Sequence, residues 1–197
     1  MNKVGLLTAT AIVAILSGGA PVAAKQPVHT PYNVLWNQNS NFGYGVVSDN
    51  FSANYSSHDS AAADDFVVPK GQSWHITEVD VTGMYYNGSG PASSEVVTFY
   101  SNTNNGKPGR VRQGPFTVNC NDNGGSFQCV LPKPVRLPSG AWWVSVVANC
   151  SFVSCGQWDW ITNTVLHRQR AVWQKNGSVR WLRLKYDLAF TLIGKKR

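Results

Sequence analysis

Two β-forming runs joined by a turn sequence constrain the fold of this chain more than any other feature. Residues 66–68 (Phe-Val-Val) favour a short strand, and a second run rich in β-branched and aromatic residues spans 74–81. Pro69, Lys70 and Gly71 lie between the runs, and Pro followed by Gly favours a tight turn. The segment therefore predicts a β-hairpin within an all-β domain.

The second run also predicts an irregular strand. Trp74 and Ile76 lie at even positions, whereas Val79 and Val81 lie at odd positions. Alternate residues of a strand point to opposite faces, so one regular strand cannot bury both pairs on the same side. We expect either a β-bulge near residues 77–78 or burial on both faces.

Similar short runs, separated by Gly, Pro and Asn turns, continue to the C-terminus. Strands are expected at 34–36, 96–100, 141–148 and 182–192, with loop or irregular edge structure at 37–60. Trp142, Val144, Val146 and Ala148 form one apolar face of the run 141–148. Trp143 and Val147 lie on its other face, which indicates a central strand covered on both sides. Leucines and aromatic residues alternate along 182–192 with Arg183, Lys185, Asp187, Ala189 and Thr191, which predicts one buried and one exposed face.

The N-terminus has the features of a secretory signal peptide. Lys3 precedes an apolar run over 4–16, residues 17–19 (Ser-Gly-Gly) interrupt a helix, and residues 22–24 (Val-Ala-Ala) offer a cleavage pattern of small residues. A bilayer-spanning helix needs about 20 apolar residues, and no second apolar run of that length follows. We expect residues 1–24 to be a signal peptide and residues 25–197 a single exported domain, secreted or periplasmic, without a transmembrane segment. An uncleaved membrane anchor is the alternative.

Four cysteines in an exported chain predict two disulfides. Cys120 and Cys129 flank a turn-rich stretch, while Cys150 and Cys155 bracket a loop of four residues. Four cysteines allow three pairings, of which we predict Cys120–Cys129 with Cys150–Cys155. A metal site is the competing interpretation, and the absence of Cys-x-x-Cys spacing disfavours it.

The run 62–83, Ala-Ala-Asp-Asp-Phe-Val-Val-Pro-x-Gly-x-x-Trp-x-Ile-x-x-Val-x-Val-x-Gly, resembles a pattern in secreted bacterial β-sandwich domains of unassigned function. The similarity extends to the segments 90–92, 99–100, 106–109, 143–146, 157–160, 171–174 and 187–194, most of the chain after residue 24. The resemblance implies export and a jelly-roll-like fold, and it brings no catalytic residues. The expected fold is an all-β, antiparallel, jelly-roll-like sandwich with two local disulfides.

Six carboxylates lie within residues 49–80. Asp64 and Asp65 are adjacent in a strand and point to opposite faces, which disfavours a glycosidase pair flanking one bond. Ca²⁺ favours hard oxygen ligands, so Asp64, Asp65 and Asp80 are candidate ligands of a structural calcium ion. No other cofactor is expected, and ordinary solvated or turn carboxylates are the alternative.

Aromatic residues supply the main binding signal. Trp158 and Trp160 share one strand face around Asp159, next to the loop that Cys150 and Cys155 bracket. Indole faces with Gln157 and Asp159 beside them can hold the apolar face of a sugar and its hydroxyls. Packing in the core is the alternative, and we assign Trp142 to the core.

Basic residues concentrate in the second half of a chain whose net charge is +7. Residues 25–106 contain two basic and seven acidic residues, whereas residues 107–197 contain fourteen basic and three acidic ones. Arg168 and Arg170 belong to a basic stretch that would attract acidic polysaccharide, lipopolysaccharide phosphates or teichoic acid. Nucleic acid is disfavoured because no binding motif is present, and a merely solvated basic surface is the alternative.

The chain lacks the sequence signatures of common hydrolases. No His-Glu-x-x-His or Gly-x-Ser-x-Gly motif occurs, and all cysteines are expected to be paired. We expect an exported, non-catalytic binding module for glycans or an anionic cell-envelope surface. Its expected binding residues are Gln157, Trp158, Asp159, Trp160, Arg168 and Arg170. An envelope domain that makes only protein contacts and a hydrolase with an unrecognised site are the alternatives.

Overall fold

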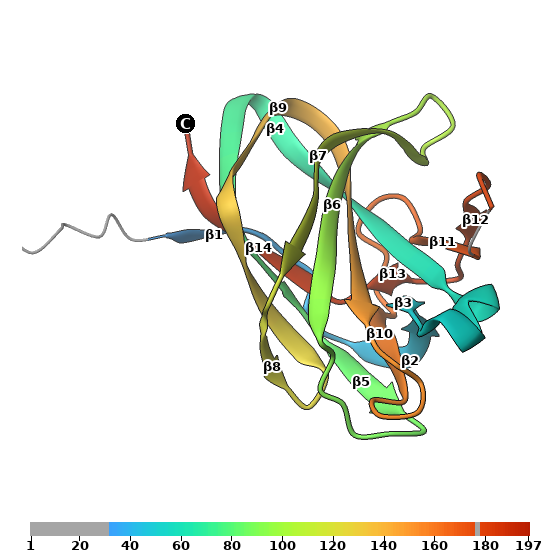
Figure 1. Ribbon diagram of the computed structural model, residues 1–197. Helices are drawn as coiled ribbons and strands as arrows, with labels where there is room; N and C mark the ends of the chain where they lie inside the picture. Colours follow the sequence, from blue (N-terminus) through green and yellow to red (C-terminus); the bar gives the residue numbers. More distant parts are fainter. Residues whose placement is uncertain (1–31, 176–177) are drawn as a thin grey trace, which may run out of the picture. The chain divides into compact units, whose positions relative to one another are not determined.

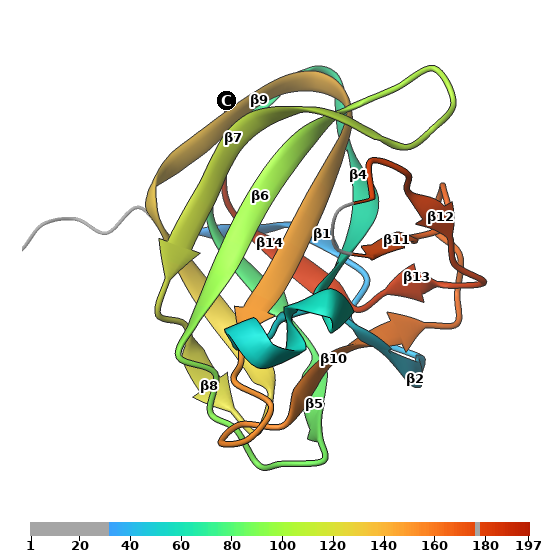
Figure 2. The same ribbon diagram turned by 45° about the vertical axis from the view of Figure 1, so that its right-hand side comes forward.

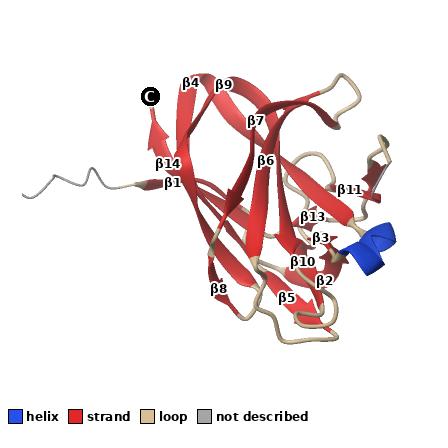
Figure 3. Ribbon diagram, in the orientation of Figure 1, coloured by secondary structure: helices blue, strands red, loops and turns tan. Residues whose placement is uncertain are grey.

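The computed structural model describes residues 32–175 and 178–197, and the predicted signal peptide lies outside them. Within these two ranges strands form nearly all regular structure, and one short 3₁₀ helix, η1 (Ala53–His58), is the exception (Figure 3). The larger sheet orders its main strands as β1 (Asn33–Asn37), β14 (Phe190–Lys196), β4 (Ser60–Val81), β9 (Ser126–Asn149), β6 (Ser94–Asn102) and β7 (Pro108–Val118) (Figure 1). Short strands β3 (Asp49–Asn50), β8 (Asn121–Asn123), β11 (Val172–Lys175) and β12 (Leu182–Arg183) join this sheet.

The smaller sheet is built around β10 (Gln157–Asn163). Its other strands are β2 (Phe42–Val47), β5 (Gly83–Tyr86) and β13 (Asp187–Leu188). Asp159 is paired with both Val47 of β2 and Met84 of β5, so these strands lie on opposite edges of β10. The predicted all-β, jelly-roll-like sandwich is confirmed as an all-β, sandwich-like fold. In the part of the chain that the structure describes, all strand pairings but that of β3 with β9 are antiparallel.

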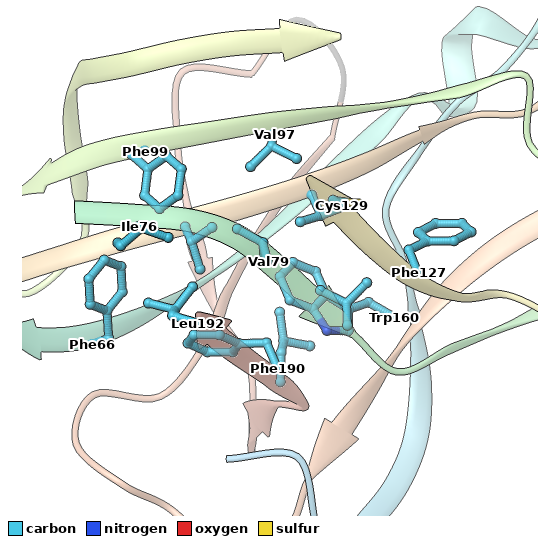
Figure 4. Close-up of a cluster of buried hydrophobic side chains, with 14 of the residues drawn as sticks. Phe66, Ile76, Val79, Val97, Phe99, Phe127, Cys129, Trp160, Phe190 and Leu192 are labelled. Atoms are coloured by element: carbon cyan, nitrogen blue, oxygen red, sulfur yellow. The ribbon is translucent and has the colours of Figure 1, made fainter. Parts of the chain in front are cut away.

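Aromatic side chains from both sheets meet in one core (Figure 4). Trp158 of β10 stacks on Phe127 of β9 with ring centroids 4.7 Å apart, and Trp160 packs edge-on against Phe190 of β14 at 6.3 Å. Residues 32–175 and 178–197 belong to one compact unit around this core. Among the described residues, no helix is long and apolar enough to cross a membrane.

The predicted hairpin at residues 69–71 is wrong, because β4 does not reverse there. β4 pairs with β9 before this point (Val68 with Gly140) and after it (Ser73 with Pro138). The two strands bend together instead, as both views of the ribbon show (Figures 1 and 2). Gly71 adopts a φ of +79° at the bend, a conformation that favours glycine. The Pro-Lys-Gly sequence therefore makes a corner that two long strands share.

The predicted irregularity of β4 is confirmed as a β-bulge. Against β14, Glu78 is paired with Ile193 and Ile76 with Gly194, so β4 has one extra residue at this point, and its register with β9 also shifts between Ile76 and Glu78. The bulge reverses the parity of the strand, so Trp74 and Ile76 are buried together with Val79 and Val81. The predicted strands at 34–36 and 96–100 are also confirmed, within β1 and β6.

The predicted central strand at residues 141–148 lies within β9 and is covered on both faces. Val144 and Val146 belong to the main core, whereas Trp143 joins a second cluster with Val172 of β11 and Trp181. The continuous strand predicted for 182–192 is wrong, because Leu182 is exposed and the chain is divided among β12, β13 and β14. Alternation in the sequence did not show these breaks.

Both predicted disulfides are confirmed: Cys120 bonds to Cys129, and Cys150 bonds to Cys155. The first closes the β8–β9 hairpin, in which Asn123 is paired with Ser126. The second closes the loop between β9 and β10.

Removal of the Cys120–Cys129 bridge is expected to lower the free energy of unfolding by about 2–3 kcal/mol, because the unfolded chain regains loop entropy. The test is urea unfolding of the Cys120→Ala/Cys129→Ala variant beside native protein. Alanine keeps the site apolar, which matters because Cys129 is fully buried. An unchanged unfolding midpoint would contradict this prediction.

Candidate functional site

The two tryptophans predicted to bind ligand are core residues, so this prediction is wrong. Trp158 and Trp160 are both 0% exposed. The Trp158 indole N–H donates to the Gly125 carbonyl at 2.7 Å, and that of Trp160 donates to the Ala189 carbonyl at 2.9 Å. The two rings do share one face of β10, as predicted, but that face points into the sandwich.

The other four predicted binding residues do not form one site. Asp159 lies on the opposite face of β10 from the tryptophans, where Gln157 donates to its carboxylate at 2.8 Å. Burial raises the pKa of Asp159. Arg168 forms an ion pair with Asp65 at 3.1 Å, and Arg170 is exposed. Of the six predicted residues, Gln157 alone lies in the hollow described below.

Asp64 and Asp65 anchor different segments of the chain. Asp64 is fully buried and accepts hydrogen bonds from the Gln38 side chain at 2.6 Å and from the Leu188 amide at 2.7 Å. Burial, followed by repulsion from Asp187, raises the pKa of Asp64 well above its ordinary value.

Asp65 holds the segment that precedes β11. Its carboxylate accepts the Gln169 amide at 3.0 Å and pairs with the Arg168 guanidinium. Burial raises the pKa of Asp65 to about 6, although both partners act to lower it. The surroundings of both carboxylates therefore fit a structural role.

The predicted calcium site of Asp64, Asp65 and Asp80 is wrong as a shared site. Within residues 32–175 and 178–197, one group alone of three or more His, Cys, Asp or Glu side chains brings its ligand atoms within 4.8 Å of one another. That group is Glu95, Cys120 and Cys129. Its two cysteines are bonded to each other, so they do not offer thiolates to a metal.

A hollow of about 520 Å³ opens where η1, the β9–β10 loop and β11 meet. Four of its lining residues carry large aromatic rings, and we call it the aromatic hollow. Its lining consists of Val47, Phe51, Tyr55, His58, Ser60, Asn87, Phe152, Gln157, Trp173 and Lys175. Ligand sites of proteins have this character, an apolar concavity with a few polar groups at its border.

The 3₁₀ helix places two of the rings. The Tyr55 amide donates to the Ser52 carbonyl at 2.8 Å as η1 begins, and Asp59, directly after η1, accepts the Phe51 amide at 2.7 Å. The carboxylate of Asp59 thus ties the two ends of this short turn together and fixes Phe51 and Tyr55 relative to each other. Figure 2 brings η1 to the front of the molecule.

The loop closed by Cys150 and Cys155 places the third ring. Phe152 lies within this loop, 5.1 Å from the Tyr55 ring and 6.1 Å from the Phe51 ring between centroids. The Phe152 carbonyl accepts the amide of Gly156, which has a φ of +91°. The disulfide and this turn therefore hold Phe152 in place on a loop.

The fourth ring belongs to β11. Trp173 is paired with Ala62 of β4, and its indole N–H donates to the Val47 carbonyl at 2.9 Å. The Trp173 side chain is half-buried, and it forms part of the lining of the hollow.

A smaller polar hollow of about 150 Å³ continues from the aromatic one, since Ser60 and Lys175 line both. We call it the polar extension. Its other lining residues are Asn50, Asp59, Ala61, Gln174 and Ser178. Aromatic faces are therefore followed by amide, hydroxyl, carboxylate and ammonium groups along one surface.

The sequence contains a signal for the aromatic hollow that periodicity alone does not reveal. Phe51, Tyr55 and Phe152 stand among Asn, Ser and Asp residues, outside any alternating apolar pattern. An aromatic ring in such a segment has no strand face that would carry it into the core. Comparison with known proteins adds no assignment, because no protein-family model and no curated protein matches this chain.

Proposed function

We propose that this protein is an exported, non-catalytic binding module, and that its ligand is a glycan of an anionic cell-envelope surface. The aromatic hollow is the proposed binding site, in place of the strand that carries Trp158 and Trp160. The single observation that carries the proposal is the group of four aromatic residues around one hollow, Phe51, Tyr55, Phe152 and Trp173.

The chemistry of the lining favours a sugar. The C–H faces of a pyranose ring pack on aromatic rings, while its hydroxyls need hydrogen-bond partners at the border. Gln157 and Asn87 offer amides for this purpose, and the polar extension would hold a following sugar unit. Lys175 lies at the junction of the two hollows and adds a positive charge, which favours an acidic sugar there.

The Tyr55→Ala/Phe152→Ala variant is expected to bind glycan with an affinity lower by about tenfold or more. A loss of about 1.4 kcal/mol in binding free energy corresponds to a tenfold loss of affinity. The measurement is retardation in gels that contain alginate, heparin or dextran. Native protein should be retarded by the two acidic polysaccharides, and Lys175→Ala should reduce this retardation.

Tyr44→Ala is the matched control, because Tyr44 is an aromatic residue with 48% exposure that does not line the hollow. It should migrate like native protein in every gel. If native protein passes all three polysaccharides unretarded, the proposal fails. Equal retardation of the double variant and of Tyr44→Ala would reject the aromatic hollow as the site.

A further inference from the structure

A row of polar side chains crosses five adjacent strands of the larger sheet. The register pairs Asn37 of β1 with Thr191 of β14, Thr191 with Asp80 of β4, Asp80 with Gln128 of β9, and Gln128 with Asn121 of β8. Residues directly opposite each other on neighbouring strands project from the same face. The five side chains therefore lie in line across the sheet.

The row lies on the outer face of the sheet. Val79 and Val81, the neighbours of Asp80 along β4, are 0% and 2% exposed and belong to the core. Since alternate side chains of a strand point to opposite faces, Asp80 points away from the core.

The centre of the row has an acceptor without a protein donor. At one end Thr191 donates to Asn37 at 3.2 Å, and at the other Asn121 donates to Gln128 at 2.9 Å. Between them, Asp80 Oδ1 is buried, and none of the described residues donates a hydrogen bond to it. Burial, followed by repulsion from Glu78 and a side-chain hydrogen bond between the two carboxyl groups, raises the pKa of Asp80 to about 7.

Asp80 borders a hollow of about 400 Å³, which we call the polar hollow. Amides and hydroxyls dominate its lining, including Asn39, Thr82, Asn121, Asn123 and Gln128. The second carboxylate there, Asp122, is already bonded to the Tyr85 hydroxyl at 2.7 Å and to the Gly125 amide at 2.7 Å. Asp80 is therefore the carboxylate of this hollow that has a buried oxygen to which no described residue donates a hydrogen bond.

We propose that the polar hollow binds a neutral polyhydroxylated ligand, a saccharide unit, with one ligand hydroxyl donating to the Asp80 carboxylate. Neighbouring hydroxyls of a sugar ring both donate and accept, which matches amide side chains beside a carboxylate. Asp80 and Asp122 in the lining, with Glu78 next to Asp80, would repel an anionic ligand, and the polar lining disfavours an apolar one. The polar and aromatic hollows share no lining residue, so this proposal does not rest on the proposed function.

The test is a nuclear magnetic resonance titration of ¹⁵N-labelled full-length protein, with the side-chain amides of Asn39, Asn121, Asn123 and Gln128 as reporters. The probes are the methyl glycosides of glucose, galactose, mannose and N-acetylglucosamine at millimolar concentration. At least one probe is expected to shift these amides in a saturable way. Asp80→Ala should abolish the shifts at concentrations that saturate native protein.

Two controls separate binding from folding and from the other hollow. Asp80→Asn should retain the native melting temperature or exceed it, because it removes a buried charge that lacks a donor. Tyr55→Ala, in the aromatic hollow, should leave the titration unchanged. The proposal is overturned if no glycoside shifts the reporter amides, if Asp80→Ala responds like native protein, or if CaCl₂ shifts them and the glycosides do not.

Discussion

Trp158→Ala is expected to lower the free energy of unfolding by about 3–5 kcal/mol, the range for large aromatic truncations in protein cores. The ring is fully buried and stacks on Phe127, so its removal leaves a cavity between the two sheets. The substitution also removes the donor to the Gly125 carbonyl. Domains have stabilities of about 5–15 kcal/mol, so this loss is a large fraction of the total. The measurement is urea unfolding followed by far-ultraviolet circular dichroism.

Trp158→Phe separates the two contributions. Phenylalanine keeps a ring against Phe127 and loses the hydrogen bond to Gly125, so a smaller loss of about 1–3 kcal/mol is expected. If the urea midpoint of unfolding of Trp158→Ala equals that of native protein, the Trp158 ring does not pack in the core. If Trp158→Ala had native stability but no longer bound glycan, Trp158 would be a ligand-binding residue, as its sequence pattern predicts.

The error over Trp158 and Trp160 shows what a period of two can establish. Residues of equal parity share a face, so Trp-Asp-Trp placed both indoles together and Asp159 opposite them. The pattern does not say which face is inside, because that depends on the sheet that packs against it. Here Phe127 and Phe190 of the other sheet cover the indoles.

Local features were predictable, and features that depend on distant pairing were not. The disulfides follow from short spacings around turns, and the bulge follows from the parity of residues within one run. The corner at Gly71 was predicted as a hairpin because the same turn residues serve both structures. What separates the two is whether residues 73–81 continue to pair with β9, whose partner residues 127–138 come much later in the chain.

The candidate site was harder to predict than the fold for the same reason. Phe51 and Phe152 lie a hundred residues apart in the sequence, and η1 and the β9–β10 loop bring their rings to 6.1 Å. The row centred on Asp80 likewise needs the registers of four strand pairs. Gln157 entered the predicted site because of its tryptophan neighbours, and it lies in the hollow for a different reason, its position at the start of β10.

Stability is expected to increase as the pH falls from 8 to about 5. Burial is the main cause that raises the pKa of Asp49 and Glu95 to about 7 and that of Asp65 to about 6. A carboxyl whose pKa is higher in the folded state binds its proton more tightly there. Its stabilising contribution is therefore complete below the pKa of the unfolded chain, near 4, and is lost as the pH rises through the folded value.

The expected change is large because several groups act in the same direction. After allowance for partial solvent screening, we expect about 2–3 kcal/mol more stability at pH 5 than at pH 8, or a melting temperature higher by about 5–10 °C. The measurement is thermal unfolding across this range at high salt. Salt is needed because acidification also increases the positive charge of a chain that is already at +7, and this repulsion acts against the effect.

Single isosteric variants identify the responsible groups. Asp49→Asn keeps an oxygen for the Trp158 amide, which the carboxylate accepts at 2.8 Å, and Glu95→Gln keeps one for the Cys120 amide, also at 2.8 Å. Each variant should have a shallower dependence of melting temperature on pH than native protein. A native melting temperature that falls between pH 8 and pH 5 at high salt would mean that these buried carboxyls are ionised at little cost. The carboxyl groups of Asp49 and Glu95 would then have to be in contact with water in solution.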